Sequence, residues 1–217
     1  MYESSKIKLR IILNALIILC VAAGVGIFIF ISDIASVMSY FTIQSNLLCL
    51  IAGGVTLTHI IKKNPVGNAY IFFKGMSLVS ILLTFFIYNF VLKQYLNISG
   101  NARGESLESI LLHIAAPLMM LCDFIFFEEK ECFKKWHPFG WTAFPFFYIA
   151  YTAVFKALGG TYQYFGGESK FPYFFLDYET YGIKTAGLWM LLITIGYIGF
   201  SYLLIGFGKL LSKIKKR

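Results

Sequence analysis

Long runs of apolar residues constrain this chain more than any other feature. A helix that crosses a bilayer needs about 20 mainly apolar residues. Segments of that kind cover residues 10–31, 40–61, 69–92, 108–127, 139–158 and 182–206. Only 14% of the 217 residues are charged, against about 25% in soluble domains. We therefore predict an all-α integral membrane bundle of six transmembrane helices, with residues 1–217 as a single domain because no segment is left for a second one.

The first apolar run follows Lys6, Lys8 and Arg10, as the apolar core of a signal peptide would. That run continues from Ile11 to Ile31, whereas the core of a signal peptide has about 7–15 residues. We therefore interpret it as a retained transmembrane helix.

Basic residues gather at one side of the predicted bundle. The N-terminus, the 62–68 turn, the 128–138 loop and the C-terminus hold 13 of the 19 Lys and Arg residues. Since basic loops stay in the cytoplasm, both termini are predicted to be cytoplasmic. The tail Lys213–Arg217 is interpreted as an anchor on anionic membrane lipids, and nucleic acid is not predicted as a partner despite the net charge of +8.

The stretch Tyr40–Leu48 opens an apolar run and yet holds Thr, Gln, Ser and Asn within five positions. Such side chains need hydrogen-bond partners where water is absent. Helical spacing gathers small and polar residues on one face, namely Thr42, Ser45, Asn46, Cys49, Gly53 and Thr56. Residues of this kind also pack helices tightly in membranes, so the stretch alone predicts either packing or a site.

His113 favours a functional site over simple helix packing. It is expected about 8 Å below the outer end of its helix, at 1.5 Å per residue, and an ionisable residue at that depth suggests function. Thr42 is expected at a similar height in its own helix. Pro117 lacks the amide that would bond the His113 carbonyl, so a kink with a free carbonyl is expected there.

Thr42 and His113 together suit nucleophilic catalysis. A threonine hydroxyl becomes a good nucleophile when a base takes its proton, and a neutral imidazole can do so near pH 7. Ser39 could cap the second helix and leave amides near Thr42 free to stabilise an oxyanion, with Asn46 as a further donor. Asp123 lies about 15 Å from His113 along the helix, and is expected to contact another helix instead.

The four cysteines are scattered and form no CxxC or Cys/His cluster. Neither a zinc site nor a disulfide framework is indicated, and no metal or cofactor is predicted.

Three motifs occur in order: Phe41-Thr42-Ile43-Gln44-Ser45-Asn46, His113-Ile114-Ala115-Ala116-Pro117 and Phe171-Pro172-Tyr173-Phe174. With them, nearly the whole chain resembles the androgen-induced membrane protein family, in its bacterial-looking branch. The resemblance implies a multi-pass threonine hydrolase of a bacterial plasma membrane, with Thr42 as nucleophile and His113 as the essential histidine. Animal members of that family cleave fatty acid esters of hydroxy fatty acids, but Gln44-Ser45-Asn46 departs from the animal pattern, which leaves the substrate open.

Three functions therefore compete. The first is an intramembrane lipid-ester hydrolase with Thr42 and His113 as catalytic residues. The second is a non-catalytic protein that binds a lipid or small amphiphile, and the third is a transporter, which the absence of internal repeats disfavours. The first two predict an amphiphile-shaped cavity between the second, third, fourth and fifth helices, with the 159–181 loop as a lid. The supporting residues are expected to be Ser45, Asn46, Asn89, Pro117, Tyr148 and Tyr151.

Overall fold

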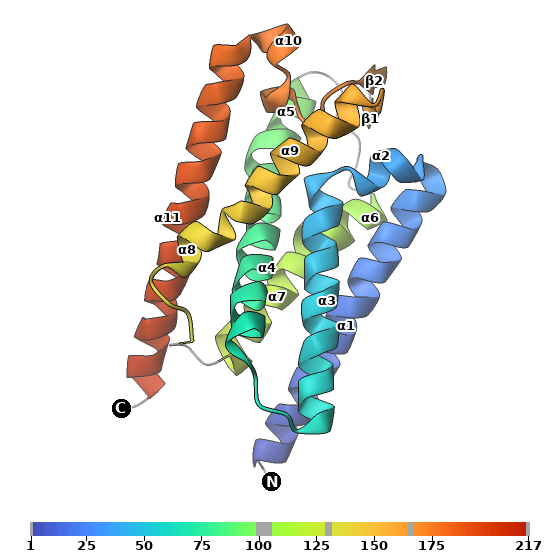
Figure 1. The fold of residues 1–217 in the computed structure, drawn as a ribbon. Coiled ribbons are helices and arrows are strands. Elements are labelled where there is room, and N and C mark those ends of the chain that lie inside the picture. Colours follow the sequence, from blue (N-terminus) through green and yellow to red (C-terminus); the bar gives the residue numbers. More distant parts are fainter. Residues whose placement is uncertain (1, 99–105, 129–131, 165–166, 216–217) are drawn as a thin grey trace.

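The computed structural model describes residues 2–98, 106–128, 132–164 and 167–215. Its long helices run side by side, with the N- and C-terminal ends at the same end of the bundle (Figure 1). The helical elements are α1 (Tyr2–Ile31), α2 (Ile34–Met38), α3 (Phe41–Lys62), α4 (Asn68–Ile87), η1 (Tyr88–Leu92), α5 (Lys93–Ile98), α6 (Leu107–Ile110), η2 (Leu111–Ala115), α7 (Ala116–Phe127), α8 (His137–Trp141), α9 (Ala143–Ala157), η3 (Phe174–Leu176), α10 (Tyr178–Tyr181) and α11 (Ile183–Lys215). The η1 and η2 segments are π-helical turns that continue the helices around them.

Five of the predicted runs form helices long and apolar enough to cross a membrane. Within the described residues they are Ser4–Ile31, Phe41–Lys62, Asn68–Ile98, Leu107–Phe127 and Ile183–Lys213. Several extend beyond the predicted apolar runs, because polar flanking residues can continue a helix outside the hydrocarbon. The predicted all-α bundle is thus confirmed, and five of its six predicted spans are found as such helices among the described residues.

The prediction of one continuous helix over residues 139–158 is wrong. This segment is divided at Thr142 into α8 and α9, and α9 alone rises about 22 Å, less than the roughly 30 Å of a bilayer core. Pro145 explains the break, because it has no amide to bond the carbonyl of Trp141. That carbonyl accepts the hydroxyl of Tyr197 in α11, at 3.3 Å.

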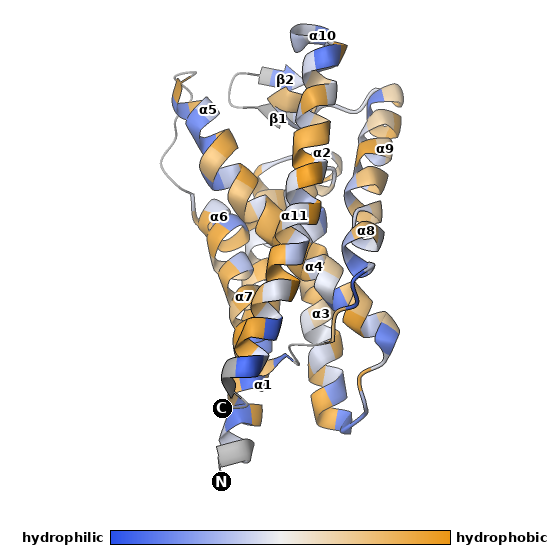
Figure 2. Ribbon diagram, turned by 90° about the vertical axis from the view of Figure 1, so that its left-hand side faces the viewer, coloured by the Kyte–Doolittle hydropathy of each residue, from blue (hydrophilic) through white to orange (hydrophobic). Residues whose placement is uncertain are grey.

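The outward faces of the long helices are apolar (Figure 2). Large apolar side chains on them are more than half exposed, including those of Leu19, Ile61, Phe147, Leu191 and Leu203. A contiguous apolar surface of this kind is unfavourable in water, whereas contact with lipid tails removes that cost. The chain is therefore an integral membrane protein.

The predicted loop 159–181 forms a cap at the end of the bundle opposite the termini (Figure 1). Its short antiparallel hairpin pairs β1 (Tyr162–Tyr164) with β2 (Gly167–Ser169), with Tyr162 opposite Ser169. The hairpin is followed by η3 and α10, so this region is more ordered than the sequence suggested.

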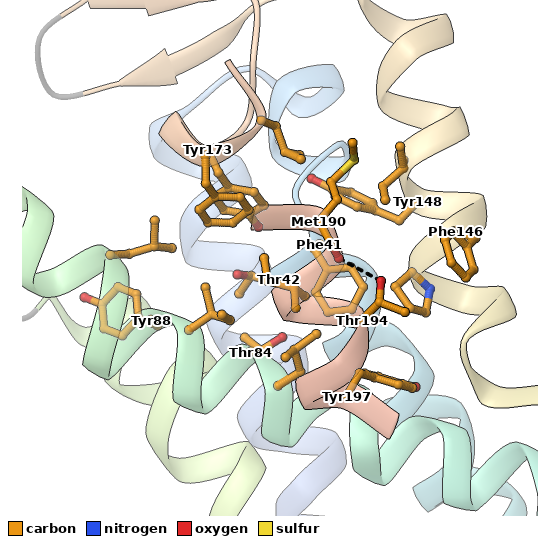
Figure 3. A pocket seen from close by; sticks show the side chains of 18 of the residues that line it. Phe41, Thr42, Thr84, Tyr88, Phe146, Tyr148, Tyr173, Met190, Thr194 and Tyr197 are labelled. Atoms are coloured by element: carbon orange, nitrogen blue, oxygen red, sulfur yellow. Dashed lines mark hydrogen bonds between the residues drawn. The ribbon is translucent and has the colours of Figure 1, made fainter. Parts of the chain in front are cut away.

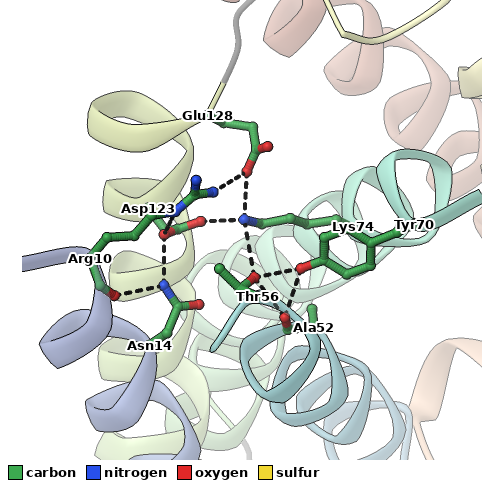
Figure 4. A network of polar contacts seen from close by, with 8 residues as sticks. All are labelled: Arg10, Asn14, Ala52, Thr56, Tyr70, Lys74, Asp123 and Glu128. Carbon is green, nitrogen blue, oxygen red and sulfur yellow. Dashed lines mark hydrogen bonds and ion pairs between the residues drawn. The ribbon is translucent and has the colours of Figure 1, made fainter. Parts of the chain in front are cut away.

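A buried ionic network holds the other end of the bundle together (Figure 4). Asp123 of α7 is fully buried and receives Nζ of Lys74 at 2.5 Å, Nδ2 of Asn14 at 2.8 Å and Nε of Arg10 at 3.3 Å. Glu128 accepts from Arg10 at 2.8 Å and from Lys74 at 2.5 Å. The expectation that Asp123 contacts another helix is confirmed, since it joins α7 to both α1 and α4.

We predict that Lys74→Met destabilises the protein by about 3–5 kcal/mol, because removing one partner leaves buried carboxylates uncompensated. Lys62→Met removes an exposed lysine from α3 and is the matched control, with a change within about 0.5 kcal/mol. Unfolding free energies in mixed detergent micelles measure both. Equal stabilities of the two variants would contradict a structural role for the network.

Candidate functional site

The polar stretch at the start of α3 is buried. Thr42 is 7% exposed, while Ser45 and Asn46 are fully buried. The buried residues of α3 include Thr42, Ser45, Asn46, Cys49, Gly53 and Thr56. The predicted polar face is therefore confirmed as the inward face of this helix.

The expected proximity of Thr42 and His113 is confirmed. The hydroxyl Oγ1 of Thr42 lies 3.2 Å from Nε2 of His113, although the two residues are 71 positions apart. Their chemical roles stay a prediction, but the distance is within the range in which a base removes a proton directly.

The other ring nitrogen of His113 determines the direction of this hydrogen bond. Nδ1 lies 3.1 Å from the backbone carbonyl of Ser109, which can only accept, so Nδ1 carries the hydrogen. In the neutral ring Nε2 is then the acceptor, and the Thr42 hydroxyl donates to it. Ser109 thus orients the imidazole, a role for which the sequence offered no acidic candidate.

Tyr88 also fixes the imidazole of His113. Its ring stacks on the imidazole with 3.7 Å between centroids and 13° between planes. The Ser109 hydroxyl donates to the Tyr88 hydroxyl at 2.6 Å. Tyr88 and His113 each lie in a π-helical turn, a distortion often found at functional sites.

The π-helical turn η2 explains how Asn46 joins two helices. The amide of Ala116 bonds the carbonyl of Leu111 rather than that of Leu112, and Pro117 has no amide to offer. The free Leu112 carbonyl instead accepts Nδ2 of Asn46 at 3.1 Å, and the same nitrogen reaches the Thr42 carbonyl at 2.8 Å. The sequence predicted a free carbonyl at His113. In the structure, the carbonyl that accepts a side-chain hydrogen bond is that of Leu112.

Ser45 ties α3 to α4. Its hydroxyl lies 2.8 Å from that of Thr84 and donates to the Thr42 carbonyl at 3.0 Å. Because the Ser45 proton is used in that bond, the Thr84 hydroxyl donates to Oγ of Ser45. Thr42 is therefore held from two sides, by η2 through Asn46 and by α4 through Ser45.

An apolar pocket opens beside Thr42 (Figure 3). It encloses about 750 Å³ of empty space including its mouth, and we call it the slot. Its wall on α4 and η1 runs from Leu83 to Leu92, about 14 Å at 1.5 Å per residue, which suits an extended alkyl chain.

The lining differs in part from the predicted cavity. The lining residues come from α3, α4, η1, α8–α9, the cap and α11, and include Thr42, Thr84, Tyr88, Thr142, Tyr148, Tyr173, Thr194 and Tyr197. The fourth predicted helix is replaced by α11, because Thr42 and Tyr88 stand between the slot and His113. From α11 the lining residues are Met190, Ile193, Thr194 and Tyr197.

Two predicted contributors do not line the slot. Asn89 donates to the carbonyl of Phe85 in its own helix, at 2.8 Å, and Tyr151 lies 3.0 Å from the hydroxyl of Ser39. Ser39 does not cap α3 either, since Tyr40 is the N-cap residue without a side-chain bond and Ser39 ends α2. Tyr148 does line the slot, as predicted.

The start of α3 offers hydrogen-bond donors beside Thr42. The amides of Ile43 and Gln44 donate to the carbonyl of Tyr40. The amides that precede them, at the first positions of the helix, have no intrahelical partner. The hydroxyl of Tyr173 lies close enough to interact with the backbone of Phe41 and Thr42 and with the Thr42 hydroxyl. Burial raises the pKa of Tyr173, so it remains a protonated donor near neutral pH.

The cap is fastened over the slot by a charged cluster. Glu179 of α10 accepts from Lys156 of α9 at 2.6 Å and from Lys170 at 3.3 Å. These hydrogen bonds lower the pKa of the Glu179 carboxyl, so the cluster stays charged near neutral pH. The Lys156 ammonium also lies 4.1 Å from the centroid of the Phe171 ring, next to Tyr173.

Sequence reasoning missed Tyr88, Ser109 and Thr84 as parts of the site. Tyr88 and Ser109 are polar residues near outer helix ends, as Thr42 and His113 are, which is a weak signal. Among the described residues, no group of three or more His, Cys, Asp or Glu is placed to hold a metal ion. Comparison of the chain with family models, curated proteins and solved structures found no match, so the functional argument rests on this geometry.

We predict that Asn46→Ala destabilises the protein by about 1–3 kcal/mol, because the Leu112 carbonyl loses its donor while buried. Pro117→Ala restores an amide that can reach this carbonyl. In a double-mutant cycle of unfolding free energies, Pro117→Ala should therefore cost less in the Asn46→Ala background than in the native protein. Additive losses would show that the two residues do not share the Leu112 carbonyl.

Proposed function

We propose that the protein is an intramembrane lipid-ester hydrolase with Thr42 as nucleophile and His113 as base. The observation that carries this proposal is the 3.2 Å contact between the Thr42 hydroxyl and Nε2 of His113 at the wall of an apolar slot. The resemblance to the androgen-induced membrane protein family supports the same roles, and by analogy favours esters of hydroxy fatty acids as substrates.

The proposed reaction has two halves. Oγ1 of Thr42 attacks the ester carbonyl carbon while Nε2 of His113 takes the hydroxyl proton. The carbon–oxygen bond to the alcohol then breaks, and His113 returns the proton to the departing alkoxide. Water attacks the acyl-threonine in the same way, which releases the carboxylic acid and restores the Thr42 hydroxyl.

The donors at the start of α3 suit the developing negative charge. The positive end of a helix dipole and free amides stabilise an oxyanion. Tyr173 lies there as a protonated hydroxyl, close to the buried hydroxyl of Tyr148. An ester oxygen in the slot would offer both hydroxyls an acceptor.

The second candidate is a protein that binds a lipid or small amphiphile without cleaving it. The apolar slot itself favours this alternative, because binding requires only a cavity, although His113 does not line the slot and would not contact the ligand directly. The two functions differ in whether removal of the Thr42 hydroxyl abolishes turnover or only alters affinity.

Purified protein in lipid nanodiscs, assayed against a panel of lipid esters, tests the proposal. Thr42→Ala and His113→Ala should each lower kcat by about a hundredfold or more, and the double variant should lose little beyond that because the pair acts as a unit. Thr42→Ser should keep measurable activity, since a hydroxyl remains.

Thr58→Ala is the matched control, because Thr58 lies on the same helix and is exposed. Covalent labelling of native protein but not of Thr42→Ala by an acylating probe would identify the nucleophile. Full hydrolysis by Thr42→Ala, or no turnover of any ester by native protein, would overturn the proposal in favour of the binder.

We also propose that α8 and α9 together make a sixth crossing, so that both termini are cytoplasmic in a plasma membrane. Along their own axes, α8 with 5 residues and α9 with 15 residues rise about 30 Å together. The basic loops lie at the end of the bundle that holds the termini. Gly100 and Gly166, in the predicted outer loops, lie outside the described residues.

Single cysteines at Lys170 and Asn64 test this topology in a background without the native cysteines. Lys170 lies in the cap and Asn64 in the opposite turn, and both are exposed. An impermeant maleimide added to intact cells should label the cysteine at Lys170 only. Labelling at Asn64 only would reverse the orientation, and labelling at both sites would contradict the six crossings.

A further inference from the structure

A second hollow lies at the end of the bundle far from Thr42. It encloses about 740 Å³ of empty space including its open mouth. Its lining residues are Ile7, Arg10, Thr56, His59, Ile60, Lys63, Asn64, Val66, Tyr70 and Glu128. Thr42 and His59 are both on α3 and about 25 Å apart at 1.5 Å per residue, so this hollow is separate from the proposed active site.

Three donor groups from two helices line the hollow. Arg10 of α1 is about one-fifth exposed and adjoins the ionic network. Lys63 ends α3 in a left-handed conformation, at φ 53°, and is exposed. His59 stacks on Tyr70, and its Nδ1 is buried without a hydrogen-bond partner among the described residues. A buried polar atom of this kind is unfavourable until something pairs with it.

The charges around the hollow do not cancel. Glu128 is its one carboxylate among the described lining residues, and the same carboxylate oxygen already takes both Arg10 and Lys74. Asp123 also pairs with Arg10 and Lys74, so the two carboxylates balance these two positive charges. Lys63 forms no ion pair with any described residue, which leaves one positive charge at the rim.

We propose that this hollow binds the phosphate group of an anionic ligand. A phosphate monoanion or diester matches the single excess charge, and its oxygens can accept hydrogen bonds from Lys63, from Nδ1–H of His59 and from Arg10. The apolar rim, formed by Ile7, Ile60 and Val66, adjoins the lipid-facing surface. Such a site can hold either the headgroup of an anionic phospholipid or free phosphate, which share the same chemistry.

Thermal unfolding of the full chain in a neutral detergent tests this proposal. The probes are inorganic phosphate, a short-chain phosphatidylglycerol and phosphatidylcholine of the same chain length. The midpoint should rise and saturate with phosphatidylglycerol or with phosphate, but not with phosphatidylcholine. Saturation with lipid alone identifies a headgroup site, whereas saturation with phosphate as well identifies a site for the free anion.

Lys63→Gln keeps the strain of the left-handed backbone and removes only the charge, so it should weaken the saturable binding about tenfold, which is about 1.4 kcal/mol. Lys62→Gln is the matched control, because the adjacent Lys62 is exposed and does not line the hollow. The proposal is overturned if no anionic probe gives a saturable shift, if phosphatidylcholine acts equally, or if the two variants behave alike. Ester hydrolysis is not part of the measurement, so its result is independent of the proposed function.

Discussion

The contact between Thr42 and His113 depends on a single amide side chain. Nδ2 of Asn46 bonds the carbonyls of Thr42 and Leu112 and thereby holds α3 against η2. This bond exists because the π-helical turn and Pro117 together leave the Leu112 carbonyl without a backbone donor. In a bilayer, such a carbonyl costs several kcal/mol unless a side chain reaches it. The distortion of one helix therefore fixes its position against another.

The remaining bonds around the site set orientation. Ser109 fixes the tautomer of His113, Tyr88 covers its ring, and Ser45 anchors the Thr42 carbonyl to α4 through Thr84. None of these groups is charged. The ionic residues are instead gathered at the other end of the bundle, where Asp123 and Glu128 pair with Arg10 and Lys74. This separation leaves the slot apolar, as an alkyl chain requires.

Some features of the structure could be predicted from the sequence and others could not. Hydropathy predicted six spans, and five of them form helices long and apolar enough to cross a bilayer, because a bilayer demands long apolar helices. Depth along two helices predicted that Thr42 and His113 lie at one height, since the rise per residue is constant. The break at Thr142 was missed, although Pro145 lies within that segment, because proline is tolerated inside membrane helices when another group satisfies the freed carbonyl. Here that group is Tyr197, which is distant in sequence.

The sequence by itself determined the membrane class, the inward polar face of α3 and the pairing of one threonine with one histidine, because these follow from local composition and regular helical geometry. Only the tertiary structure decided that α11 rather than the fourth predicted helix walls the slot, that Ser109 orients His113, and that Asn89 and Tyr151 bond elsewhere. Those outcomes depend on which helices pack together and which buried donors meet which acceptors, and helical periodicity carries no information about either.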